Sequence, residues 1–178
     1  MLSKTTHIIN NFGLSYEVQK LKKEGLWILT SELMQNIMPH SDCVFVTNSE
    51  NSLIKALNRA TNYRILTNGR LFKKYIFFEK LESFPQFPFF PPTINKISEC
   101  SEQNLALLFA LWTESEVVYL FGFDIENLNE RAILLSIIEA HPHQRIFYVR
   151  KPNKTKIRLF DRFSNVRVID YKEYENAK

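Results

Sequence analysis

The sequence has few of the residues on which several common kinds of site depend. It contains two cysteines, Cys43 and Cys100, which lie far apart in the chain. That spacing excludes a disulfide framework, a zinc knuckle and a Cys-x-x-Cys redox pair. It contains four glycines, and they form no Walker loop and no complete G-x-G-x-x-G motif, while G-x-S-x-G and H-E-x-x-H are also absent.

Long hydrophobic runs are also missing. The longest apolar stretches, such as Ala106–Trp112 and Ala132–Leu135, are far shorter than the roughly 20 residues that a membrane-spanning helix needs. The opening residues, MLSKTTHIINN, lack the apolar core of a secretory signal. We therefore expect a cytoplasmic protein without a membrane span.

The overall composition is that of an ordinary globular protein. Hydrophobic residues make up 45% and charged residues 24% of the 178 residues, which argues against disorder, collagen-like repeats and a coiled coil. A chain of this length predicts a single domain over residues 1–178.

Short apolar runs alternate with segments of helical periodicity. The predicted strands are residues 7–10, 26–30, 43–48, 63–68, 117–123 and 145–149, and the predicted helices lie around 14–21 and at 32–38, 49–61, 101–113 and 127–140. The runs are continuously apolar rather than alternating, as expected for parallel strands covered by helices on both faces. The pattern predicts an α/β fold, a Rossmann-like open and mainly parallel sheet.

Helical spacing also predicts which side chains of the two later helices face the core. For residues 101–113 the inward residues are Leu105, Leu108, Phe109 and Trp112. For residues 127–140 they are Leu128, Ala132, Leu135 and Ile138.

The segment 84–92, FPQFPFFPP, interrupts the alternation with four prolines and four phenylalanines. Proline excludes helix and central strand there. The segment is either an aromatic lid or docking surface, or a stiff loop whose rings pack on the core.

The segment 145–171 interrupts the alternation a second time and predicts a C-terminal β extension, a β-hairpin followed by an edge strand. Residues 145–167 carry 8 basic and 1 acidic residue. Such a surface either binds a polyanionic, phosphate-bearing partner or protects a sheet edge from pairing.

Polar residues lie at the carboxyl ends of most of the predicted strands: Asn11, Thr30, Ser31, Thr47, Asn48, Thr67, Asn68 and Asp124. Ligands of open α/β sheets bind outside the carboxyl ends of the strands, where amides and hydroxyls suit ribose and base groups. The alternative is that these residues cap helices and form turns.

Catalytic and metal-binding patterns are sparse. His141 and His143 flank Pro142 without a carboxylate at a fixed spacing, so we expect a helix C-cap and no metal site. Asp124 is the acid best placed to act on a ligand hydroxyl or a metal-bound phosphate, unless it caps the helix that follows.

Two segments resemble a known group of proteins. Residues 8–15, IINNFGLS, resemble a turn written G-N-G-P-S-L, and the helix and strand of Ser101–Asp124 resemble a helix followed by IYLLGFD. The two patterns that these segments resemble occur in the bacterial sialyltransferase-like glycosyltransferases and in the related 6-hydroxymethylpterin pyrophosphokinase MptE-like proteins, which have Rossmann-like folds.

The resemblance implies that Asn11, Asn48 and Ser101 hold a nucleotide and that Asp124 is the candidate catalytic residue of a transferase. It identifies no cofactor. Asn10 replaces the group's first glycine, which indicates a ligand site that is lost or altered.

Two functions therefore remain open. The first is a nucleotide or nucleotide-sugar site of glycosyltransferase-like type. The second is a non-enzymatic interaction module that uses residues 84–92 and the basic tail to bind a protein, a polyanion or a second copy of the chain.

Overall fold

The structure, a computed structural model, describes residues 5–10, 23–30, 43–47, 49, 51, 64–67, 101–150 and 157–177. The strands are β1 (Thr5–Ile9), β2 (Leu26–Thr30), β3 (Cys43–Thr47), β4 (Arg64–Thr67), β5 (Val117–Phe121), β6 (Arg145–Arg150) and β7 (Val166–Asp170). The helices are α4 (Glu102–Trp112), α5 (Leu128–Ala140) and α6 (Tyr171–Asn176).

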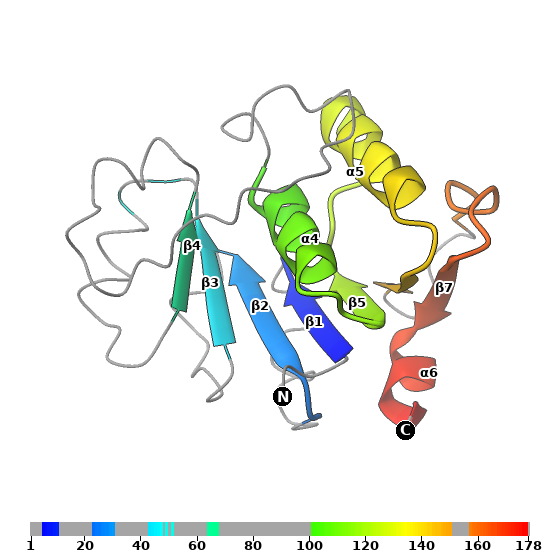
Figure 1. The fold of residues 1–178 in the computed structure, drawn as a ribbon. Helices are drawn as coiled ribbons and strands as arrows, with labels where there is room; N and C mark the ends of the chain where they lie inside the picture. The colour runs from blue at the N-terminus through cyan, green and yellow to red at the C-terminus, as the bar shows by residue number, and fades with distance from the viewer. Residues whose placement is uncertain are drawn as a thin grey trace.

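The strands form one sheet with the order β4-β3-β2-β1-β5-β6-β7 (Figure 1). Every neighbouring pair is parallel, so the predicted Rossmann-like parallel sheet is confirmed. The chain adds β2, β3 and β4 on one side of β1, then returns to add β5, β6 and β7 on the other side. The strand order therefore reverses between β1 and β5.

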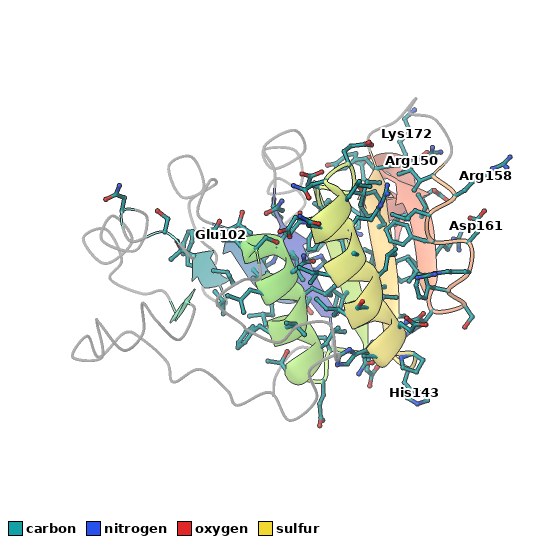
Figure 2. The ribbon with its side chains drawn as sticks, turned by 90° about the horizontal axis from the view of Figure 1, so that it is seen from above. Glu102, His143, Arg150, Arg158, Asp161 and Lys172 are labelled. Carbon is teal, nitrogen blue, oxygen red and sulfur yellow. The ribbon has the colours of Figure 1, made fainter. Side chains whose placement is uncertain are left out.

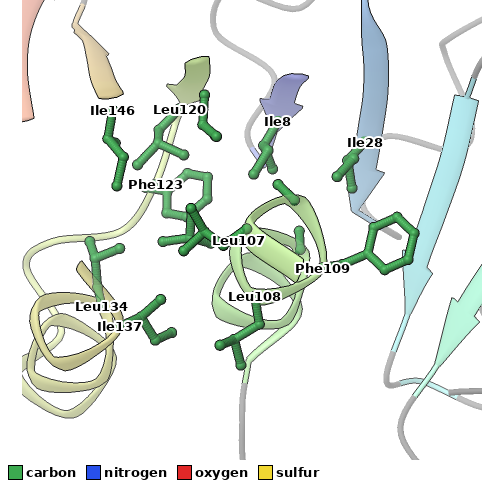
Figure 3. Packing of buried hydrophobic residues seen from close by; sticks show 14 of the residues in the cluster. Ile8, Ile28, Leu107, Leu108, Phe109, Leu120, Phe123, Leu134, Ile137 and Ile146 are labelled. Carbon is green, nitrogen blue, oxygen red and sulfur yellow. The ribbon is translucent and has the colours of Figure 1, made fainter. Parts of the chain in front are cut away.

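Helices α4 and α5 cover one face of this sheet. Figure 3 shows Leu107 of α4 beside Phe123, Phe109 of α4 on the side of Ile28, and Leu134 of α5 on the side of Ile146. These side chains belong to one buried aliphatic cluster. Continuous apolar runs are expected where both faces of a sheet are covered, and successive residues of β1 and β2, which point to opposite faces, are buried.

Helix α4 is buried along nearly its whole length. Residues 103–111 are all buried, and the helix contacts β1, β2, β3 and α5. The inward positions predicted for Leu105, Leu108 and Phe109 are confirmed; the side chain of Trp112 lies outside the description.

The face predicted for α5 is wrong in part. Leu134, Ile137 and Ile138 are its buried residues, whereas Leu128 is 67% exposed and Ala132 is also exposed. The helix carries two overlapping apolar stripes. The stripe with Leu134, Ile137 and Ile138 is the buried one.

The predicted β-hairpin is also wrong, although β7 is an edge strand as predicted. Strand β7 pairs with β6 in parallel, and residues 157–165 contain no strand. Instead, successive turns place Phe160 in the core, where its ring lies 5.2 Å from that of Tyr148. Burial of this ring outweighs the strand-like pattern of the segment.

The opposite face of the sheet carries a row of rings in one cross-strand register. Trp27, His7, Tyr119 and Phe147 are consecutive partners across β2, β1, β5 and β6. The ring centroids of successive members lie 4.4, 5.3 and 5.0 Å apart, and all three pairs are stacked.

Helix α6 covers this row through Tyr174, which is fully buried. The Tyr174 hydroxyl donates to His7 Nδ1 at 3.0 Å, and His7 Nε2 donates to the Glu24 carbonyl at 3.1 Å. Both nitrogens of the neutral ring are therefore satisfied. Burial, more than the nearby Lys23 charge, lowers the pKa of His7 to about 4.

Gly25 accommodates this histidine at the start of β2. Its φ is +142°, and a Cβ there would lie 2.7 Å from the Thr5 carbonyl oxygen and 2.9 Å from His7 Nε2. Any other residue would collide with backbone and ring, so the close approach requires glycine.

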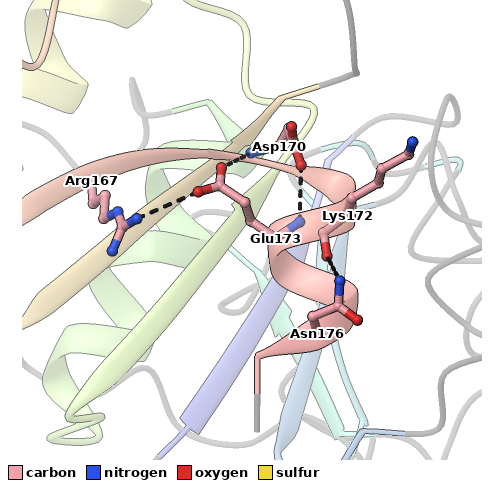
Figure 4. A network of polar contacts seen from close by, with 5 residues as sticks. All are labelled: Arg167, Asp170, Lys172, Glu173 and Asn176. Carbon is pink, nitrogen blue, oxygen red and sulfur yellow. Dashed lines mark hydrogen bonds and ion pairs between the residues drawn. The ribbon is translucent and has the colours of Figure 1, made fainter.

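Side-chain contacts hold both ends of α6. Asp170 and Glu173 form a capping box at its start, and Arg167 pairs with Glu173 at 3.4 Å (Figure 4). At its end, the Lys23 ammonium donates to the carbonyls of Tyr174 and Ala177. The helix thus joins β7 to the start of β2.

Several predictions lie outside the described residues: the helices expected around 14–21, at 32–38 and, apart from residues 49 and 51, at 49–61, and the phenylalanine- and proline-rich segment 84–92. Within the described ranges, no helix has the length and apolarity needed to cross a membrane.

Candidate functional site

The carboxyl ends of β1 and β5 meet where the strand order reverses. The backbone N–H of Asn10 donates to the Phe121 carbonyl at 2.9 Å, which extends the pairing beyond β1. Helix α4 begins at the same edge, because Gln103 in its first turn contacts residues that follow both strands. Open α/β sheets bind ligands at such reversals.

Gln103 is the residue that joins these three elements. It is 3% exposed, and its Oε1 accepts hydrogen bonds from Asn10 Nδ2 at 2.9 Å and from the Asp124 N–H at 2.7 Å. Its Nε2 donates to the Asp124 carbonyl at 3.1 Å. The amide thus pairs with both backbone groups of Asp124 and fixes the turn after β5.

Asn10 and Gln103 were not among the residues predicted to form the site. Asn10 also donates to the Gly122 carbonyl at 3.3 Å, and accepts at its own carbonyl from Thr30 Oγ1 at 3.4 Å. No motif marks a glutamine in a first helical turn, and its partner Asn10 lies 93 positions away. The one sequence signal was the polar residue that directly follows the apolar run of β1.

Asp124 lies at this edge and is exposed. Its Oδ1 accepts from the backbone N–H groups of Glu126 at 2.9 Å and Asn127 at 3.2 Å. This is the turn-forming role that the sequence left open as an alternative. The catalytic role of Asp124 stays a prediction.

Ser101 is the N-cap of α4, and its Oγ accepts from the Asn104 N–H at 3.4 Å. It therefore lies at the same edge as Asp124, since Gln103 follows it by two residues. Asn11 and Asn48 lie outside the described residues, as do Ser31 and Asn68. Thr47 Oγ1 accepts from the Ser49 N–H at 3.1 Å, a local turn contact.

The first turns of α4 and α5 touch through Asn104. Its side chain is fully buried, and Nδ2 donates to the Glu130 carbonyl at 3.2 Å and to the Glu130 carboxylate at 2.7 Å. Asn104 Oδ1 has no hydrogen-bond partner in the described part of the chain. Reversing the amide would set oxygen against two acceptors, so Glu130 fixes its orientation.

Negative charge gathers beside this edge. Burial, followed by the carboxylates of Glu126 and Asp124, raises the pKa of Tyr148 to about 12. The Tyr148 hydroxyl donates to the Phe123 carbonyl at 3.1 Å. The phenol therefore contacts the residue that precedes Asp124.

Among the described residues, no group of three or more potential metal ligands occurs. His141 is the C-cap of α5, with Nδ1 2.8 Å from the Ile137 carbonyl oxygen, which confirms the predicted helix C-cap. His143 lies at the opposite end of the sheet from Glu102 and Arg150 (Figure 2).

The described arginines of the basic segment are spread over both ends and both faces of β6 and β7. Arg145 begins β6 and Arg150 ends it, while Arg158 lies on the connection to β7 (Figure 2). Arg167 pairs with Glu173 of α6. Polyanion binding by this segment stays a prediction, as does self-association.

No protein-family model matches the chain, and no curated protein or solved structure is significantly similar to it.

Proposed function

We propose that the chain binds a nucleotide or nucleotide sugar at the carboxyl edge between β1 and β5, in the manner of a glycosyltransferase-like protein. The observation that carries this proposal is the reversal of strand order at β1 and β5, where Gln103 holds the ends of both strands to the first turn of α4. Brought together in this way, strand ends and a helix start form the usual ligand position of open α/β sheets.

Asp124 is the proposed acid of this site. Two backbone N–H groups hold its Oδ1, which orients the carboxylate and leaves the second oxygen to accept a ligand hydroxyl. In a transferase, a carboxylate in this position acts as a general base toward an attacking hydroxyl. In a protein without transfer activity, the same contact serves recognition alone.

Titration calorimetry tests the proposal with CMP, UDP, GDP and ATP in the presence of magnesium. We expect at least one of them to bind with a dissociation constant below about 1 mM, near −4 kcal/mol. Asp124→Asn keeps an Oδ1 acceptor for the turn but removes the charge, and it should weaken that binding about tenfold.

Asp161→Asn is the matched control, because Asp161 is also exposed but lies on the connection between β6 and β7. It should leave the affinity unchanged. If none of the four nucleotides binds below about 1 mM, or if the two variants behave alike, the proposed site is rejected.

A further inference from the structure

Several backbone donors at the described carboxyl edge are already engaged by side chains of the protein. Gln103 takes the N–H of Asp124, and Asp124 takes those of Glu126 and Asn127. Asn127 takes those of Asn129 and Glu130. A phosphate bound at a helix start requires such N–H groups, so the turn after β5 and the start of α5 have few left to give it.

Acceptors, in contrast, are abundant at this edge. The carboxylates belong to Asp124, Glu126 and Glu130, whereas Glu102 at the start of α4 already has a partner of its own. Arg150 ends β6, the strand next to β5, in register with Asp170 of β7. Arg131 adds a positive charge at the start of α5, but the carboxylates outnumber it, so this region favours groups that donate hydrogen bonds over phosphate.

The buried carboxamide of Asn104 is a second, independent sign of a missing donor. Its Oδ1 is buried without a partner in the described chain, and an unpaired buried carbonyl is unfavourable. Because Glu130 holds Nδ2, the side chain cannot turn to relieve this. A hydroxyl that enters between the first turns of α4 and α5 would supply the donor.

We infer that the edge formed by the first turns of α4 and α5 receives the sugar of a nucleotide sugar and not its phosphates. This inference rests on the proposed function and specifies which part of the ligand lies beside the first turns of α4 and α5. Sugar hydroxyls would donate to Asp124, Glu130 and Asn104, while the phosphates lie away from these carboxylates.

The test compares bare diphosphates with their sugar-linked forms, UDP with UDP-glucose and GDP with GDP-mannose, by calorimetry on the full chain. The sugar-linked form of at least one pair should bind about tenfold more tightly than the bare one. Glu130→Gln, which keeps an acceptor for Asn104 Nδ2, should remove most of that advantage and leave the affinity for the bare diphosphate unchanged or higher. Glu139→Gln, in the last turn of the same helix, should change neither.

Three results overturn the inference: equal affinity for the bare and sugar-linked forms, tighter binding of the bare form, or equal weakening of both forms by Glu130→Gln. In all three, the proposed nucleotide site would stand and only the assignment of the sugar to this edge would be wrong. If no nucleotide binds, the proposed function fails; saturable binding of free glucose, followed by NMR and weakened by Glu130→Gln, then keeps only the sugar-binding part of the inference, and its absence rejects that part as well.

Discussion

On the face under α4 and α5 the sheet presents aliphatic side chains such as Ile8, Leu120 and Ile146, whereas on the face under α6 it presents His7, Trp27 and Tyr119. The aliphatic face is stabilised by apolar area removed from water, which depends little on direction or pH. The aromatic face depends on directed contacts around a buried neutral imidazole. One sheet therefore combines a pH-insensitive face with a pH-sensitive one.

The largest effect should come from a cavity on the aliphatic face. Leu120 is fully buried, and Leu120→Ala should lower the free energy of unfolding by about 2–5 kcal/mol. Urea titration at pH 7 and at pH 5 measures this loss, which should be the same at both values. A loss that differs strongly between the two would contradict the proposed contrast of the faces.

Acid should next weaken the aromatic face. The pKa of His7 lies near 4 in the folded protein and near 6.5 when unfolded, so the unfolded state takes up the proton first as the pH falls. The contribution of neutral His7 is complete above pH 6.5, is lost between pH 6.5 and 4, and amounts to about 3 kcal/mol.

NMR titration of the imidazole signals measures this pKa directly. His7→Phe should flatten the dependence of stability on pH over that interval, and His143→Asn, at the exposed end of the α5–β6 connection, should not. Native-state titration of His7 near pH 6.5 would show that the ring is not buried as described.

The smallest effect should follow removal of one hydroxyl on each face. Tyr174→Phe deletes the donor to His7 Nδ1, and Tyr148→Phe deletes the donor to the Phe123 carbonyl. Each should lower the free energy of unfolding by about 1 kcal/mol. Only Tyr174→Phe should also raise the pKa of His7, because its hydroxyl favours the neutral ring; equal pKa values in the two variants would count against this contact.

The fold could be predicted because parallel strands leave a strong local pattern. LWILT reads as a buried strand, and β2 is Leu26–Thr30. The hairpin prediction failed because residues 156–163 alternate like a strand while Phe160 is needed in the core. Local pattern cannot show which ring the core will take.

The site was less accessible to prediction. Asp124 and Ser101 could be placed at the carboxyl edge because each adjoins a strand or helix end. The hydrogen bonds of Gln103 could not be predicted, since its partners lie 21 and 93 positions away. Neither Gln103 nor Asn10 is part of a recognisable sequence motif. Likewise, the sequence predicted no role for His7, because its partner Tyr174 lies 167 positions further on.

The contact of α6 with β1 has a consequence for folding during synthesis. The ribosome delivers His7 early, but the ring that covers it comes 167 residues later. Contacts of such long sequence separation close slowly and late. The Tyr174–His7 contact can therefore form only after Tyr174 has left the exit tunnel, and until then His7 lacks that hydrogen bond.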